Sequence, residues 1–302
     1  MLETPHSPIF SCIPPRHETE AGVVHTTMLG EGITWSTEEQ ALWWIDIEGR
    51  ALFRHRDGVT RRWPLAEKPG ALAPRRGGGI LLALVSGIGT FDPATGLWSR
   101  IAAFEPPVPH GRANDGKCDR QGRFWCGVMD SRGDRDSGGL YRLDAHGLAT
   151  RCIDGLTVPN GLAWSPDGTR VYLADSPTGT IRVYDFDPNT GAFLHGRSFA
   201  EVPGPGVPDG ATVDADGYLW TCEWGGSRLV RYAPDGAVDR IVPMPVSNPT
   251  CCTFGGPDLR TLYVTSARQG LDAEALAKEP NAGGVFGLDV GVAGVAEAGW
   301  SG

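Results

Sequence analysis

Three oxygen-bearing side chains, each directly followed by a glycine, are the residues of this chain best suited to hold a cation. Glu31 lies in "LGEGITW", Asn160 in "VPNGLAW" and Asp209 in "VPDGATV". Asn-Gly and Asp-Gly are also common turn sequences, whereas Glu is not a turn-forming residue. Carboxylate and amide oxygens carrying two negative charges would suit a divalent cation, provided that the fold brings the three motifs together.

A repeated unit in the sequence predicts that it does. Short runs of β-branched and aromatic residues recur roughly every 38 to 48 residues, which is the period of a four-stranded propeller blade. The runs are "LWWID", "ILLAL", "FWCGV", "VYLAD", "LWTCE" and "LYVTS". We therefore expect an all-β fold, a six-bladed β-propeller with four-stranded blades around a central channel. A β-sandwich is the alternative, but sandwiches do not usually repeat with this period.

The first strand of each predicted blade begins in a similar way and should line the central channel. Aligned on the glycine, the preceding residues are Glu31, Pro69, Asp115, Asn160, Asp209 and, without a glycine, about Thr250. Glu31, Asn160 and Asp209 should then converge at the channel mouth, with Asn114 close by. Two carboxylates in so narrow a space repel each other unless a cation binds between them. The sequence therefore predicts one divalent metal site, and oxygen ligands allow Ca²⁺, Mg²⁺, Mn²⁺, Zn²⁺ or Fe²⁺.

Taken together, these motifs resemble the regucalcin and gluconolactonase family of sugar lactonases, the senescence marker protein family. The resemblance runs from about Leu29 to the C-terminus and rests on "LGEG", "RANDGKCDRQGRFWCGVMD", "VPNGLAWSPDG", "VPDGATVDADGYLW" and "CCTFGGPDLRTLYVTSARQGLD". It implies a six-bladed propeller with one catalytic divalent metal, bound by Glu31, Asn160 and Asp209.

The resemblance also implies which residues contact substrate. Arg112 and Asn114 match family residues that bind the sugar lactone. A further Glu that helps to bind substrate in regucalcin is matched here by Arg132, so that contact does not carry over. The nearest acid, Asp130, is the candidate in its place.

The chemistry expected of such a site is hydrolysis of a cyclic ester, as in a carboxylic ester hydrolase. A metal on the carbonyl oxygen acts as a Lewis acid, and Asp209, or water on the metal beside it, is the candidate general base. Arg112 could stabilise the developing negative charge. Two alternatives remain open: a phosphotriesterase or arylesterase, whose substrate would favour an apolar pocket wall, and a non-catalytic calcium-binding propeller. Cys222 and Trp224 could line the pocket or pack in the core.

Composition limits the partners. The chain has 302 residues and a formal net charge of −9, which argues against nucleic acid or an anionic membrane as the main partner. Residues 1–20 are expected to form a weakly ordered lead-in without signal-peptide character, and residues 21–302 a single domain. The seven cysteines include no C-x-x-C pair, so we expect reduced thiols, with no bond between Cys251 and Cys252, in a cytoplasmic monomer or weak homo-oligomer.

Overall fold

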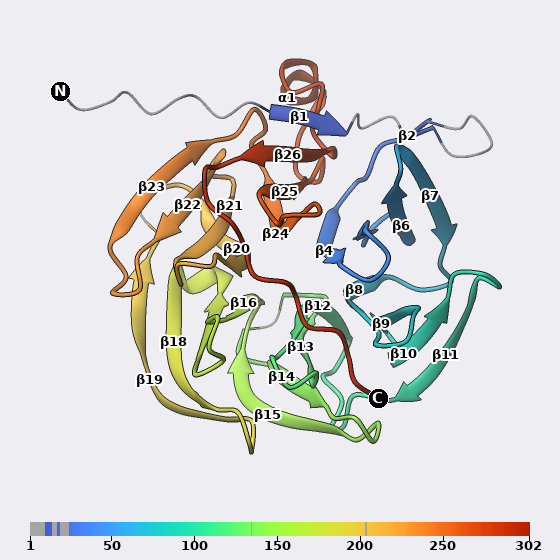
Figure 1. The fold of residues 1–302 in the computed structure, drawn as a ribbon, viewed down its shortest axis with the longest axis vertical. Helices are drawn as coiled ribbons and strands as arrows, with labels where there is room; N and C mark the ends of the chain where they lie inside the picture. The colour runs from blue at the N-terminus through green and yellow to red at the C-terminus, as the bar shows by residue number, and fades with distance from the viewer. Residues whose placement is uncertain (1–9, 14–16, 19–23, 134, 203) are drawn as a thin grey trace.

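Six four-stranded antiparallel sheets surround a central axis, which confirms the predicted six-bladed β-propeller (Figure 1). The computed structural model describes residues 10–13, 17–18, 24–133, 135–202 and 204–302. In each of the first five blades the chain runs from the innermost strand to the outermost. The inner strand of every blade therefore faces the channel, as the repeat predicted.

The strands follow one another blade by blade. Blade one contains β4 (Gly30–Ser36), β5 (Ala41–Asp46), β6 (Ala51–Arg56) and β7 (Val59–Pro64). Blade two contains β8 (Pro69–Pro74), β9 (Ile80–Leu84), β10 (Gly87–Asp92) and β11 (Leu97–Ala102). Blade three contains β12 (Gly111–Cys118), β13 (Phe124–Asp130), β14 (Gly138–Leu143) and β15 (Ala149–Leu156). Blade four contains β16 (Pro159–Trp164), β17 (Arg170–Asp175), β18 (Thr180–Asp187) and β19 (Ala192–Glu201).

Blade five contains β20 (Val207–Val213), β21 (Leu219–Trp224), β22 (Arg228–Tyr232) and β23 (Val238–Pro243). Blade six contains β24 (Pro249–Gly255), β25 (Thr261–Ser266), β26 (Val285–Asp289) and, from the start of the chain, β1 (Phe10–Ile13). Outside the blades are the pair β2 (His17–Glu18) and β3 (Val24–His25), the short helix α1 (Ala273–Lys278) and the 3₁₀ turn η1 (Ser176–Thr178). No helix among the described residues is long and apolar enough to cross a membrane.

The repeated runs form the second strand of each blade, and their large side chains fill the space between blades. Trp43, Trp125 and Trp220 are all fully buried. Burying such a side chain stabilises the fold by roughly 1.5–3 kcal/mol, so the repeated aromatic positions account for much of the core.

Blade six closes the ring with strands from both ends of the chain. β1 pairs antiparallel with β26, with Phe10 opposite Leu288 and Ile13 opposite Val285. The C-terminal part of the chain supplies only three strands of this blade, so the edge of β26 is available for a fourth. The expected boundary between a lead-in and the propeller at residue 21 does not account for this strand. Most of the remaining lead-in lies outside the described residues.

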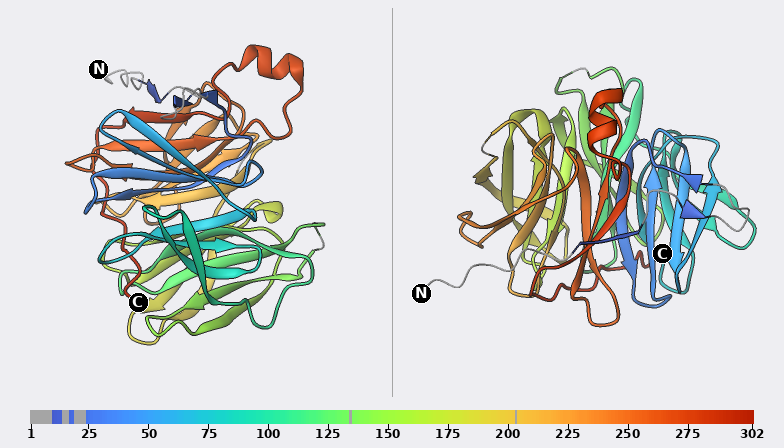
Figure 2. Two further views of the ribbon diagram at one scale, coloured as in Figure 1. Left: turned by 90° about the vertical axis from the view of Figure 1, so that its right-hand side faces the viewer. Right: turned by 90° about the horizontal axis from the view of Figure 1, so that it is seen from above.

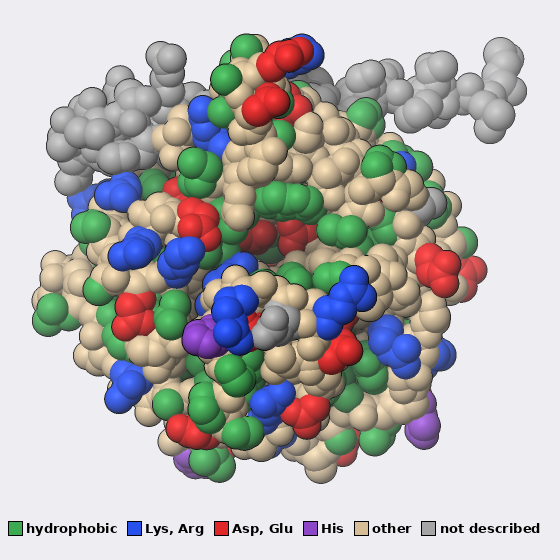
Figure 3. All heavy atoms as spheres, turned by 180° about the vertical axis from the view of Figure 1, so that it is seen from behind, with side chains coloured by type: hydrophobic (Ala, Val, Ile, Leu, Met, Phe, Trp, Pro, Cys, Tyr) green, Lys and Arg blue, Asp and Glu red, His purple; other side chains and the backbone are tan. Residues whose placement is uncertain are grey.

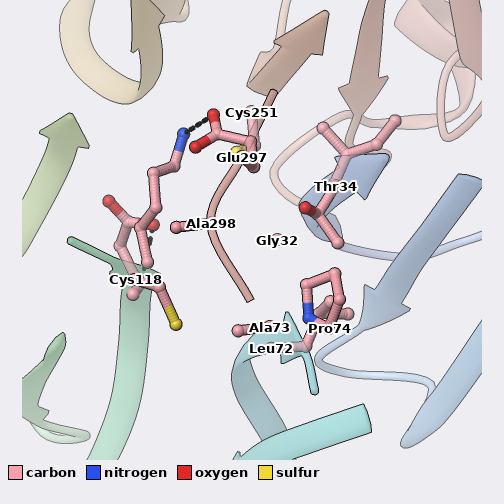
Figure 4. A pocket seen from close by; sticks show the side chains of 13 residues that line it. Gly32, Thr34, Leu72, Ala73, Pro74, Cys118, Cys251, Glu297 and Ala298 are labelled. Atoms are coloured by element: carbon pink, nitrogen blue, oxygen red, sulfur yellow. Dashed lines mark hydrogen bonds and ion pairs between the residues drawn. The ribbon is translucent and has the colours of Figure 1, made fainter. Parts of the chain in front are cut away.

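The last residues, 290–302, cross the ring on the face opposite α1, and we call them the C-terminal strap (Figures 1 and 2). The strap forms backbone bridges from Gly294 to Asp214 of blade five and from Trp300 to Arg75 of blade two. Between these bridges Glu297 reaches into the channel, where its Oε1 lies 2.8 Å from Nζ of Lys117 (Figure 4). The strap therefore closes one end of the channel with a buried ion pair.

The six cysteines whose side chains the structure describes are free thiols. Cys251 and Cys252 are neighbours on β24, and adjacent residues of a strand point to opposite faces. They accordingly pack in different core clusters, one beside Ile33 and Trp35 and the other beside Trp220. Cys222 is also fully buried in the second of these clusters, so it belongs to the core rather than to the pocket wall.

Candidate metal and substrate site

A pocket of about 330 Å³ opens at the channel mouth on the face that carries α1. Figure 3 shows this face hollowed near its centre, with acidic side chains at the floor and hydrophobic side chains at the rim. Five of the six predicted site residues line the pocket: Glu31, Arg112, Asn114, Asn160 and Asp209. They come from β4, β12, β16 and β20, so four of the six inner strands contribute to one site.

Irregularities in these inner strands turn the polar side chains toward the pocket. In β4 the register with β5 shifts between Glu31 and Thr34, and in β16 it shifts between Asn160 and Ala163. The glycines after Glu31 and Asn160 have φ of 58° and 64°, a left-handed conformation that other residues rarely adopt. A bulge of this kind bends the strand and redirects a side chain, which explains why Glu31 and Asn160 are each followed by glycine.

Glu31 and Asp209 are two buried acids that form no ion pair with the residues that the structure describes. Their exposed fractions are 9% and 5%. Burial raises the pKa of both carboxyls well above the ordinary value, and neighbouring carboxylates raise it further. Among the described residues no lysine or arginine forms an ion pair with either acid, and Arg112 is the nearby positive group that partly offsets the effect. The site therefore has an excess of negative charge in a poorly solvated space.

A third acid, Asp115, lies deeper in the channel, and its carboxylate is hydrogen-bonded to the backbone. Its carboxylate accepts hydrogen bonds from the backbone N–H of Gly116 (2.8 Å) and of Leu162 (3.0 Å). The second bond joins the inner strands of blades three and four. Asp115 does not line the pocket but a small cavity beneath it, of about 10 Å³, beside Lys117. The sequence alignment on glycine made Asp115 equivalent to Glu31, Asn160 and Asp209. In the structure its carboxylate instead connects two blades.

A chain of hydrogen bonds orients the amides of the site. Arg112 donates from Nη1 to Oδ1 of Asn114 (2.8 Å), and Asn114 donates from Nδ2 to Oδ1 of Asn160 (3.0 Å). Asn160 in turn donates from Nδ2 to the hydroxyl of Ser176 (2.8 Å), which donates to the carbonyl of Pro208 (2.7 Å). The oxygen of Asn160 is therefore directed toward Asn114, and its nitrogen toward Ser176.

Apolar side chains line the pocket together with the polar ones. They are those of Leu29, Ile47, Val158, Val207 and Trp224, and the lining also includes Pro177 and Gln269. Trp224 is partly buried and packs against the core cluster that contains Leu29 and Ile47, so its ring is held firmly. The pocket can therefore take a small molecule that carries both polar groups and C–H groups.

Asp130 is not among the residues that line the pocket. It ends β13 and accepts hydrogen bonds from the backbone N–H of Arg132 (2.7 Å) and from its side chain (3.4 Å). Two other acids, Asp46 and Asp175, end β5 and β17. Each of these two accepts two backbone N–H groups from the loop that leads into its inner strand.

The sequence analysis did not identify Ser176, nor Asp46 and Asp175, whose carboxylates accept hydrogen bonds from the loops. A signal for Asp46 and Asp175 was present, because the runs "LWWID" and "VYLAD" both end in Asp at the same point of the repeat. No such signal marks Ser176, because its partners belong to two different blades.

Comparison with known proteins agrees with this geometry. The sequence model described as "SMP-30/Gluconolactonase/LRE-like region" matches residues 29–268. The chain belongs to this family. It is 41% identical over 281 residues to the L-arabinolactonase of Azospirillum brasilense, a match that covers 91% of this chain and 92% of the relative. It is also 41% identical over 277 residues to the 6-deoxy-6-sulfogluconolactonase of Pseudomonas putida, covering 90% and 94% of the two chains.

Solved structures of the SMP-30/gluconolactonase family have the same fold. The crystal structure of regucalcin from Agrobacterium tumefaciens, described as a calcium-binding protein, superposes with a TM-score of 0.87 at 31% sequence identity. The match covers 91% of this chain and 94% of the regucalcin. The family resemblance suggested by the motifs is thereby confirmed.

Proposed function

We propose that this protein hydrolyses a sugar lactone to the open-chain sugar acid and that it requires one divalent metal ion. The observation that carries the proposal is the meeting of two buried, unpaired acids, Glu31 and Asp209, with an amide of Asn160 in one pocket. The family includes relatives named L-arabinolactonase and 6-deoxy-6-sulfogluconolactonase, which supports a sugar lactone as the substrate class.

The residues present fit a hard divalent cation. Two carboxylates and an amide oxygen are the ligand types that such cations prefer, and two negative charges would balance its charge. The deficit of positive charge around Glu31 and Asp209 is the independent reason to expect one. Glu31, Asn160 and Asp209 would hold the ion, and oxygen ligands alone do not select among Ca²⁺, Mg²⁺, Mn²⁺, Zn²⁺ and Fe²⁺.

When bound, the cation supplies Lewis acidity toward the lactone carbonyl. The protein supplies the remaining functions. We assign to Asp209 the role of the base that takes a proton from the attacking water; like Glu31, it accepts a backbone hydrogen bond from the glycine that follows it. Arg112 already donates from Nη1 to Asn114 and to the carbonyl of Ala113, and its remaining N–H groups can bind the substrate oxygens. Asn114 keeps that guanidinium in place.

The apolar lining also contributes to substrate binding. Trp224 and Val207 offer surfaces for the C–H groups of a lactone ring, while the polar residues of the pocket can bind its oxygens. Aryl esters are a second candidate substrate class, because their rings would pack on the apolar side chains that line the pocket. In that case the same carbonyl chemistry applies to an open-chain ester.

The test is a panel of pentono- and hexonolactones and aryl esters, assayed by proton release before and after chelation and with each metal restored. We expect at least one sugar lactone to be hydrolysed fastest, with activity lost on chelation and recovered with metal. Preference for aryl esters would favour the second candidate. Metal binding without hydrolysis of any substrate would instead favour a calcium-binding propeller, and full activity in chelator would overturn metal dependence.

A further inference from the structure

We infer that Ser176 fixes the amide of Asn160 so that its oxygen, and not its nitrogen, faces the proposed metal. This role rests on the proposed function, because it concerns a ligand of that metal. Ser176 begins η1 directly after β17, lines the pocket and is 6% exposed. It is a positioning residue, since it acts through Asn160.

The direction of each hydrogen bond follows from the groups involved. A serine hydroxyl has one proton, and the carbonyl of Pro208 can only accept it, at 2.7 Å. Toward Asn160 the Ser176 oxygen must therefore accept, at 2.8 Å, and only the amide nitrogen can donate to it. The amide oxygen of Asn160 is left on the opposite side, where Asn114 donates to it.

The same hydroxyl connects the two strands that carry ligands. Asn160 is on β16 of blade four, and Pro208 directly precedes Asp209 on β20 of blade five. The backbone of Ser176 is tied to the first of these blades, because its N–H donates to the carbonyl of Val158 (3.0 Å). Ser176 is thus held by the backbone of both blades, and this position lets its hydroxyl fix the rotation of the Asn160 amide.

The experiment compares metal binding by the full chain and by Ser176→Ala. Titration calorimetry with Mn²⁺ and with Ca²⁺ should give a Kd about 10- to 100-fold weaker for the variant, the usual effect of removing a group that orients a metal ligand. Thr178→Ala is the matched control, because this hydroxyl lies in the same turn, is exposed and donates only to the carbonyl of Asp175 (2.7 Å). The control should bind metal like the parent.

A double-variant cycle separates orientation from packing. In an Asn160→Asp background both ligand atoms are oxygens, so rotation of the group no longer matters. Ser176→Ala should then change the Mn²⁺ affinity by less than about threefold, so the two substitutions are not additive, as expected of residues in contact. An equal loss in both backgrounds, or Ser176→Ala binding Mn²⁺ within twofold of the parent, would overturn the role of Ser176. A parent that binds neither ion would overturn the proposed metal dependence itself, and with it this role.

Discussion

Carboxylates stand at both ends of the central channel, in opposite electrostatic settings. At the strap, burial alone would raise the pKa of Glu297, but Lys117 at 2.8 Å and the charge of Arg120 bring it below the ordinary value. At the pocket, burial and neighbouring acids raise the pKa of Glu31 and Asp209, and no ion pair compensates among the described residues. The buried negative charge is thus compensated by a basic side chain at the strap end of the channel, and it is not compensated in this way at the pocket end.

The difference indicates which acids support the fold and which serve a ligand. A buried acid with a structural role is retained together with its cation and its hydrogen bonds, as Glu297 is with Lys117 and Thr212. Acids left without such partners destabilise the fold, and proteins tolerate this mainly at functional sites. The missing charge at Glu31 and Asp209 is therefore best explained by an external cation.

The largest effect should come from removing the carboxylate of Asp209, which is proposed to be both a metal ligand and the general base. Asp209→Asn keeps the size of the side chain and one oxygen ligand but removes the base, so kcat should fall by roughly 10² to 10⁴. Metal should still bind at raised concentration through Glu31 and Asn160. Metal content measured beside kcat checks both statements. A variant that hydrolyses lactone within about threefold of the parent at saturating metal would place the base elsewhere.

Asn160→Asp is the matched comparison for that variant. It adds a negative charge instead of removing one, so the cation should bind more tightly while its Lewis acidity falls. Activity should then decrease with metal occupancy intact. If both variants lost metal and activity in parallel, Asp209 would be a ligand without a separate role as base.

At the strap, breaking the ion pair should affect stability and leave the pocket unchanged. Glu297→Gln leaves the ammonium of Lys117 without its charge partner at 12% exposure, and the expected loss is about 3 kcal/mol of the free energy of unfolding. Urea unfolding of the metal-free protein measures this, with Mn²⁺ affinity as the second readout. The double variant Lys117→Met/Glu297→Leu should lose less than Glu297→Gln, because no unpaired charge remains. A large loss of Mn²⁺ affinity in Glu297→Gln would contradict the separation of the two ends.

At the pocket the same type of substitution should have the opposite sign. Glu31→Gln removes one of two like charges, so the metal-free protein should gain about 1 kcal/mol in the free energy of unfolding, as is common when functional strain is removed. Mn²⁺ should no longer stabilise the variant as it stabilises the parent, because stabilisation by a ligand requires its binding. Thermal unfolding with and without Mn²⁺ tests both effects. Destabilisation of the metal-free variant would show that Glu31 already has a structural partner.

The parts of this comparison were predictable from the sequence to different degrees. The blades and the positions of Glu31, Asn160 and Asp209 follow from a local repeat, since five of the six inner strands start with a glycine signal of their own. The ion pair of Lys117 and Glu297 joins residues 180 positions apart, and nothing near either residue indicates the other. The strand Phe10–Ile13 was missed for the same reason, because its pairing with β26 depends on ring closure. Contacts within a blade are encoded locally, whereas contacts across the ring arise only from its closure.

The smallest effect concerns the pH dependence of the strap. Because the pKa of Glu297 is lowered in the folded protein, the unfolded chain binds a proton first as the pH falls, and the stability that Glu297 contributes is present above a pH of about 4.5 and lost below it. The pKa of Lys117 is raised by Glu297 against the effect of burial, so its contribution is complete below a pH of about 10.5 and lost above it.

Between about pH 5 and pH 10 the difference in unfolding free energy between the parent and Glu297→Gln should be constant, and it should shrink as the pH falls from about 4.5 toward 3. Urea unfolding of both proteins at several pH values, in chelator, measures the difference while titration of all other groups cancels. A difference that already declines between pH 7 and pH 5 would mean that Glu297 is not held ionised by Lys117, and the contrast between the two ends of the channel would then fail.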